Sequence, residues 1–408
     1  LAAVACNRGA GPSYSRGVEL FYFGNSTRFF SKWLPRDPVT ATEDELLLLS
    51  MDWESLDNSR LMRKKSDGAW EEEPCPILDT KLLYHPDQTH KLLFTKEGLV
   101  FVRITRPYKG KGSCRVTLRK VTDQVTWSEF SKFSFPSQGE NAIELTARLG
   151  DSFAVLQINN EGDYSGILTP DLGQSWHKLA GTLPFPDSKR FPPGENRSLL
   201  FTLSARKELR LVCGDAKEMF EFRGQADGAF KLISTTPNQG RAWLGRNLTR
   251  PKSIYRCNLS EPGRQAGKRS LIFAIGEELE EGWKEAAVIC PDLDTSIAEL
   301  RISGRDDLVV CSWIGGDRKL RYSASKDNGR KWSPARVLET KDYRVPHPDA
   351  NNRNVRLTLQ EAFDNAERLD ETFSYDQYLV GPDVVFVRSH MLKDTVHKEL
   401  IIDWGARL

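Results

Sequence analysis

Two short stretches of the sequence share one pattern of residues. Residues 325–332 read SKDNGRKW, and residues 169–176 read TPDLGQSW. A serine or threonine comes first in both, and aspartate, glycine and tryptophan follow at the same spacing. The hydroxyl and the carboxylate can accept hydrogen bonds from nearby backbone amides, glycine takes a positive φ angle, and tryptophan packs onto an apolar layer. The pattern therefore predicts a tight turn between two antiparallel strands.

Weaker copies of this turn recur along the chain. An aromatic residue follows a turn sequence at intervals of about fifty residues, at Trp70, Trp127, Trp176, Phe230, Trp283 and Trp332. Two or three runs of strand-forming residues precede each of these anchors. A unit of this length, repeated around an axis, predicts an all-β fold: a single β-propeller of four-stranded antiparallel blades, with the turn between the third and fourth strands.

The two ends of the chain decide the number of blades. Residues 378–380, 384–388 and 399–404 would supply three strands after the sixth unit, and residues 18–23 would supply a fourth. Pairing of these N- and C-terminal strands would close a seventh blade and remove an exposed sheet edge. We therefore favour seven blades. Six is the alternative, if the C-terminal strands complete the sixth blade.

The repeat is interrupted near its end. We assign residues 18–408 to the propeller and treat 341–377 as an insertion, in which the spacing of 357–369 predicts a short amphipathic helix. Such an insertion is either a functional loop over one face or a solvated connector.

Residues 1–17 are interpreted as an N-terminal tether. The first six residues, LAAVAC, resemble the end of a secretory signal and a bacterial lipobox, in which Cys6 is acylated. The resemblance implies an exported protein, either a periplasmic or cell-surface lipoprotein or a secreted one, with membrane contact only through a lipid anchor at Cys6. The alternative is a trimmed chain with an uninformative first turn.

Composition excludes several classes of function. With 58 basic and 56 acidic residues interspersed, the chain has no basic stripe, so nucleic acid is not an expected partner. No apolar run approaches about 18 residues, so no helix is expected to span a bilayer. The histidines and cysteines show no metal-ligand spacing, and no phosphate-binding loop appears, so neither a metal nor a cofactor is expected. Cys213 and Cys311 lie in strand-like runs, where we expect free, buried thiols.

The two turns resemble the Asp box, or BNR repeat, of sialidases and related β-propellers. The first repeat unit adds to this resemblance, because Arg36-Asp37-Pro38 stands where sialidases usually have Arg-Ile-Pro, ahead of a leucine-rich strand. The resemblance implies that Arg36 and Arg318 belong to a group of arginines that holds the carboxylate of sialic acid. It places no second arginine and no activating glutamate, for which the nearest candidates are Glu195, Arg246 and Arg256.

The resemblance also implies a set of catalytic groups. Asp57 would be the acid/base catalyst, and Asp52 is its rival and a substrate-binding candidate. Tyr375 and Tyr378 are candidates for the nucleophile, because a neutral tyrosine does not repel an anionic substrate. Two hypotheses follow. The protein is an exported, sialidase-like propeller that recognises glycans or glycoconjugates and hydrolyses terminal sialic-acid-type or other glycosidic bonds, or it is a non-catalytic propeller that binds a protein or glycan partner at the cell envelope.

Overall fold

The computed structural model describes residues between Glu19 and Trp404, with gaps. The gaps longer than three residues span 32–38, 51–59, 75–87, 187–190, 192–197, 261–268, 277–282, 339–343, 347–355, 359–371 and 392–397. The predicted tether over residues 1–17, including Cys6, lies outside the described residues, so export and acylation stay predictions.

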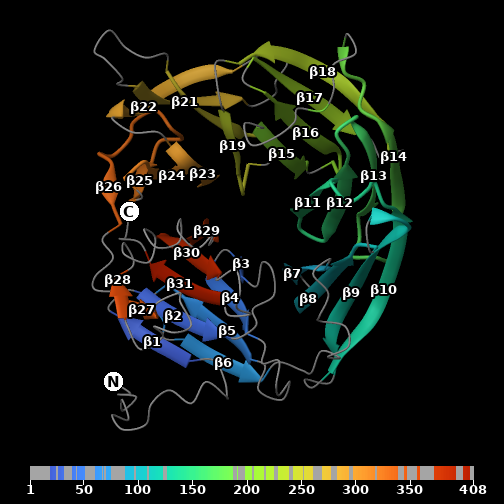
Figure 1. Ribbon diagram of the computed structural model, residues 1–408, viewed down its shortest axis with the longest axis horizontal. Helices are drawn as coiled ribbons and strands as arrows, with labels where there is room; N and C mark the ends of the chain where they lie inside the picture. The colour runs from blue at the N-terminus through green and yellow to red at the C-terminus, as the bar shows by residue number, and fades with distance from the viewer. Residues whose placement is uncertain are drawn as a thin grey trace.

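The described strands form seven antiparallel groups, each of four or five strands, which lie as blades around a central axis (Figure 1). The predicted all-β propeller is confirmed. Numbered from the inner strand outward, blade 1 contains β3 (Val39–Ala41), β4 (Glu45–Ser50), β5 (Arg60–Lys65) and β6 (Trp70–Pro74). Blade 2 contains β7 (Gln88–Thr95), β8 (Gly98–Thr105), β9 (Ser113–Thr122) and β10 (Thr126–Pro136). Blade 3 contains β11 (Ile143–Leu149), β12 (Ser152–Ile158), β13 (Asp163–Thr169) and β14 (His177–Thr182).

The next three blades follow the same order. Blade 4 contains β15 (Ser198–Leu203), β16 (Leu209–Gly214), β17 (Glu218–Gly224) and β18 (Phe230–Pro237). Blade 5 contains β19 (Ala242–Asn247), β20 (Ile254–Leu259), β21 (Arg269–Gly276) and β22 (Lys284–Leu293). Blade 6 contains β23 (Ile297–Arg305), β24 (Leu308–Gly315), β25 (Leu320–Ser325) and β26 (Arg336–Val337).

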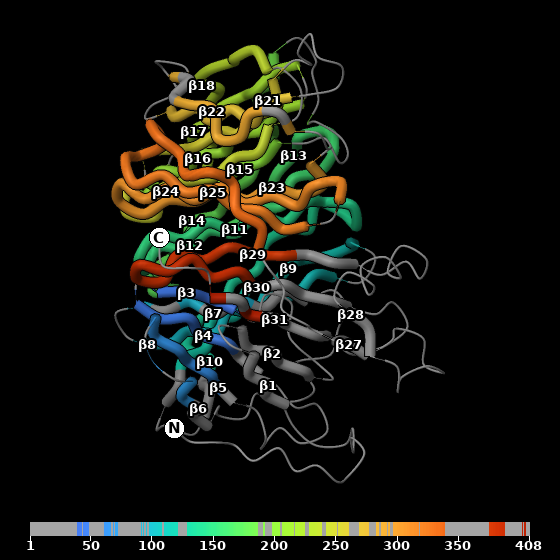
Figure 2. The backbone as a smooth tube through the Cα atoms, turned by 90° about the vertical axis from the view of Figure 1, so that its left-hand side faces the viewer, coloured from blue at the N-terminus to red at the C-terminus, as the bar shows by residue number. Residues whose placement is uncertain are grey.

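Blade 7 combines the two ends of the chain. Its strands, from the inside, are β29 (Thr372–Val380), β30 (Asp383–Met391), β31 (Lys398–Trp404), β2 (Ser26–Ser31) and β1 (Glu19–Phe23). Both views place β29 and β30 between blade 6 and blade 1 (Figures 1 and 2). The N-terminal strand that pairs with β31 is β2, and the expected strand at 18–23 pairs outside it. Gly24-Asn25 is a hairpin signal between two strand-forming runs, and it makes the second run the partner of the sheet.

Blades pack face to face through their middle strands. Every residue of β12 and of β16 is buried, because each blade is covered on both faces by its neighbours. Such strands read as continuous apolar runs and lack the alternation of a half-exposed sheet. The resulting apolar clusters each join adjacent blades, such as blades 3 and 4 or blades 5 and 6.

The two stretches 169–176 and 325–332, which we call the Trp-anchored turns, have the predicted geometry. In the second turn, the Ser325 hydroxyl accepts a hydrogen bond from the Gly329 amide at 2.8 Å, and Asp327 Oδ1 accepts one from the Lys331 amide at 2.8 Å. In the first turn, Asp171 Oδ1 accepts from the Ser175 amide at 2.8 Å. Each turn connects the third and fourth strands of its blade, as expected.

The interrupted segment differs from its prediction. The described part contains a two-stranded hairpin, β27 (Arg344–Pro346) and β28 (Arg356–Thr358), which includes the first two residues of the expected helix. The remainder of that helix lies outside the described residues. Residues 372–377 belong to the inner strand of blade 7, so the insertion ends before them. Their alternation of aromatic and polar residues suits a strand with one buried face.

The five described cysteines are free thiols. Cys213 and Cys311 are buried, as predicted. Within the described residues, no helix is long and apolar enough to cross a membrane, and no cluster of potential metal ligands occurs.

Candidate functional site

A cavity of about 600 Å³ lies at the centre of the ring. The described residues that line it come from the inner strands of six blades, namely β3, β7, β11, β19, β23 and β29, and from the residues that follow some of these strands. Inner strands that surround one axis bring side chains together from distant parts of the sequence. The cavity is therefore a property of the closed ring.

The described lining is rich in cations. It contains Lys91, Arg148, Arg246 and Arg305, and one carboxylate, that of Asp376. Asp376 Oδ1 is in turn 3.7 Å from Nε of Arg301, which is not a lining residue. Positive charge in the cavity wall thus exceeds negative charge.

Three of these cations occupy the same place in their blades. Arg148, Arg246 and Arg305 are each the last or next-to-last residue of an inner strand, in β11, β19 and β23. The inner strands β19 and β23 run parallel to each other. The ends of these strands therefore meet at one end of the cavity. An arginine just before the first hairpin of a repeat unit is the signal in the sequence that could have identified them.

Arg148 and Arg246 form the centre of this cationic wall. Arg246 Nη1 donates a hydrogen bond to the Arg148 carbonyl oxygen at 3.3 Å, and Arg148 Nε donates to the Gly150 carbonyl oxygen at 3.3 Å. Within the described part of the chain, no carboxylate forms an ion pair with either guanidinium group. Two like charges therefore lie close together with only neutral acceptors.

Burial lowers the pKa of both guanidinium groups below the ordinary arginine value. For Arg148, the carboxylate of Asp151 raises the pKa and the charge of Arg246 lowers it further. Removal from water and mutual repulsion both disfavour the charged forms. An anion placed between the two groups would relieve both effects.

The two predicted tyrosines face different surroundings. Tyr378 lines the cavity, and its hydroxyl donates a hydrogen bond to the Val39 carbonyl oxygen of blade 1 at 3.3 Å. Tyr375 is 2% exposed, and its hydroxyl donates to the Ser312 carbonyl oxygen of blade 6 at 2.9 Å. Burial raises its pKa far above the ordinary tyrosine value. Tyr375 packs between blades and does not line the cavity.

The other predicted site residues fall in the gaps. Arg36, Asp52, Asp57 and Arg318 lie outside the described residues, so their assigned roles stay predictions. Of the three nearest candidates for the missing arginine and glutamate, Arg246 lines the cavity. Arg256 lies over the ring of Trp283, 4.9 Å from its centroid, and Glu195 falls in a gap.

Comparison with known proteins yields similarity of structure only. No family model matches the chain, and no curated protein matches its sequence. An ulvan lyase, which is a polysaccharide lyase, is similar at a TM-score of 0.49 and 9% identity, over 92% of this chain and 94% of that one. The BP39L lectin from Burkholderia pseudomallei is similar at a TM-score of 0.47 and 12% identity, over 92% and 99%. The Aleuria aurantia lectin is similar at 0.39 and 12%, over 79% and 97%.

Proposed function

We propose that this protein is a glycan-binding propeller whose central cavity takes an acidic saccharide. The observation that carries the proposal is the buried pair Arg148 and Arg246, whose hydrogen-bond partners are backbone carbonyl oxygens. Guanidinium groups bind carboxylate and sulfate oxygens with paired hydrogen bonds, and such bonds are strongest where water is excluded. An acidic group on a sugar would supply the missing negative charge.

The remainder of the cavity suits a sugar. Its volume of about 600 Å³ lies within the usual range for sites that enclose small ligands. Thr42 and Ser303 present hydroxyl groups in the wall, and Leu149 and Tyr378 present apolar surface. A saccharide has both kinds of surface, hydroxyl groups around a ring with apolar faces. Export, which residues 1–6 predict, would bring this site into contact with extracellular glycans.

Glycoside hydrolysis is the second candidate function, and the position of Tyr378 in the cavity wall favours it. A tyrosine nucleophile beside an arginine pair would suit an anionic sugar. Release of a fluorogenic aglycone from sialosides and neutral glycosides tests this activity, with Tyr378→Phe and Asp57→Asn as controls. No turnover on any substrate would leave binding alone.

The binding proposal is tested by calorimetric titration with matched ligands. Methyl sialoside and methyl glucuronide are each compared with their carboxyl methyl esters, which keep the sugar and remove the charge. We expect the acids to bind and the esters to bind at least about thirty-fold more weakly, the effect of leaving buried charges without a partner.

Matched variants locate the site. Arg148→Met and Arg246→Met should each reduce affinity for the acids by a similar factor. Arg206→Met is the control, because Arg206 is exposed in the turn between β15 and β16. Equal binding of acids and esters, or equal loss in all three variants, would refute the proposal. Binding of a protein partner without any saccharide would favour the alternative.

A further inference from the structure

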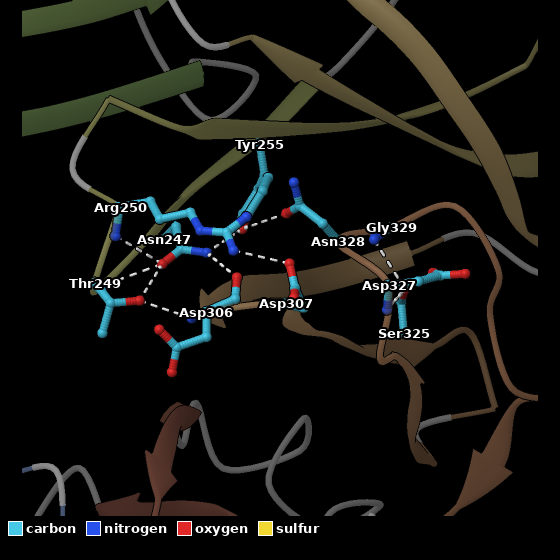
Figure 3. A network of polar contacts seen from close by, with 10 residues as sticks. All are labelled: Asn247, Thr249, Arg250, Tyr255, Asp306, Asp307, Ser325, Asp327, Asn328 and Gly329. Carbon is cyan, nitrogen blue, oxygen red and sulfur yellow. Dashed lines mark hydrogen bonds and ion pairs between the residues drawn. The ribbon is translucent and has the colours of Figure 1, made fainter.

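Asn247 is buried in the cavity wall directly after Arg246. The side chain is 1% exposed, and its Nδ2 donates to the Tyr255 hydroxyl and to the Asp306 carbonyl oxygen, both at 2.8 Å. Its Oδ1 accepts from the Thr249 amide at 3.0 Å and the Thr249 hydroxyl at 2.9 Å (Figure 3). Every hydrogen-bonding position that these contacts use points away from a ligand. Asn247 is therefore engaged by the protein itself.

These contacts belong to a closed ring of residues. The Tyr255 hydroxyl donates to Asn328 Oδ1 at 3.3 Å, and the Asn328 amide donates to the Asp307 carbonyl oxygen at 2.7 Å. Arg250 Nη2 is 2.9 Å from Asp307 Oδ1, and the Arg250 amide donates back to Asn247 Oδ1 at 2.9 Å (Figure 3). The ring connects the first hairpin of blade 5, the first hairpin of blade 6 and the second Trp-anchored turn.

The same region contains a backbone connection between blades. Strands β19 and β23 pair in parallel, with Arg246 opposite Ser303 and Asn247 opposite Gly304. A Cβ at Gly245 would lie 2.0 Å from the Ile302 carbonyl oxygen, so a residue without a side chain is required for this approach. The Leu248 amide continues the connection by donating to the Gly304 carbonyl oxygen at 2.7 Å. The strand end that carries Arg246 is thus held on both sides.

We infer that Asn247 and Tyr255 are positioning residues that hold Arg246 beside Arg148 in the central cavity. The inference rests on the proposed function of that cavity. Two guanidinium groups repel each other, so their backbone must be fixed if both are to face one anion. The ring of contacts at Asn247 supplies this restraint, and it makes the second Trp-anchored turn a support of the ligand site.

Tyr255→Phe is the most informative variant, because Asn247→Ala removes several buried hydrogen bonds at once and endangers folding. Tyr255 is fully buried and does not line the cavity, so its hydroxyl acts only through neighbours. Tyr164→Phe is the matched control. The Tyr164 hydroxyl is also buried between blades and donates to the Gly228 carbonyl oxygen at 2.9 Å, far from Arg246 in sequence and in its contacts.

Titration with methyl sialoside forms a double-mutant cycle. We expect Tyr255→Phe to weaken binding about five-fold, a typical coupling between contacting residues. It should have no further effect in the Arg246→Met background, and Tyr164→Phe should leave affinity unchanged although both hydroxyl deletions lower stability. Equal weakening in both backgrounds, or none in either, would overturn the inference.

A second measurement keeps the inference testable if the saccharide does not bind at all, which would refute the proposed function. Exchange of the Arg246 Nε proton is followed by NMR on arginine-labelled protein, with the signal identified by its loss in Arg246→Met. Faster exchange in Tyr255→Phe than in the unchanged protein and in Tyr164→Phe would support positioning. Unchanged exchange would overturn it.

Discussion

The two Trp-anchored turns have the same backbone and different surroundings. Leu172 and Asn328 have φ angles of 52° and 56°, and the glycines that follow have 85° and 87°. In both turns the residue before glycine donates its amide to the first hairpin of the same blade, from Leu172 to Asp151 at 2.9 Å and from Asn328 to Asp307 at 2.7 Å. The turn itself is therefore an element of blade architecture.

The side chain before the glycine is what differs. Leu172 is 6% exposed and packs as an apolar residue, whereas Asn328 accepts a hydrogen bond from Tyr255 and joins the ring of contacts behind Arg246. One turn thus only closes its blade, and the other also supports the cavity wall. A shared motif predicts shared backbone geometry, and its variable positions decide any further role.

The largest expected effect comes from adding a methyl group to the turns. A Cβ at Gly329 would lie 2.0 Å from Phe273 Cε1, while one at Gly173 would lie 2.7 Å from Ser131 Oγ. Positive φ and overpacking together should cost Gly329→Ala about 3 kcal/mol of unfolding free energy. Gly173→Ala should cost less, about 2 kcal/mol, because a serine hydroxyl can rotate away and an aromatic ring cannot. Urea unfolding measures both, and an equal or reversed order would contradict the packing argument.

Exchanging the variable side chains tests the comparison itself. Leu172→Asn buries an amide without designed partners and should lower stability by about 2 kcal/mol, with no effect on saccharide affinity. Asn328→Leu should weaken saccharide binding several-fold, because the Tyr255 hydroxyl loses its acceptor. Unfolding and titration of both variants give the result. Loss of affinity in Leu172→Asn would show that the two turns are equivalent.

The smallest expected effect concerns acid. Backbone and hydroxyl donors, first the Lys331 amide and then the Ser325 hydroxyl, hold the pKa of Asp327 below its ordinary value of 3.8. Burial raises the pKa of Asp171, but the Ser175 hydroxyl and amide outweigh it, so the net shift is also downward. A pKa lowered by folding stabilises the protein above the unfolded value, and this contribution is lost as pH falls through the folded value.

Asp171→Asn and Asp327→Asn should therefore be less stable than the unchanged protein at neutral pH, and the difference should vanish in acid. Urea unfolding between about pH 7 and pH 2 checks this. The effect should be larger for Asp171, which also accepts the Ser175 hydroxyl at 2.6 Å. A difference that grows on acidification would contradict the assigned sign.

The turns could be predicted from the sequence because their determinants are local. Ser325, Asp327 and Gly329 satisfy one another within five residues, and the same spacing recurs at Thr169. The strand that pairs with β31 was placed one strand too early, since two adjacent aromatic-rich runs have equal propensity for that role. Propensity identifies a strand, and the pairing of chain ends selects its partner.

The cavity could not be predicted in the same way. Arg148 and Arg246 are 98 residues apart, and only closure of the ring brings them together. Tyr375 and Tyr378 are separated by an odd number of residues, so they point to opposite faces of β29. One packs against blade 6 and the other against blade 1. A sequence pattern containing both rings has no information on which face meets the cavity.

The central claim is that the Arg148 and Arg246 pair binds the acidic group of a saccharide. Its most direct test is calorimetric titration of the unchanged protein and of Arg246→Met with methyl sialoside and methyl glucuronide, and with their carboxyl methyl esters. We predict that at least one of the acids binds, that its ester binds at least about thirty-fold more weakly, and that Arg246→Met removes this preference. Acid and ester binding with equal affinity, or an acid preference that survives in Arg246→Met, would contradict the account.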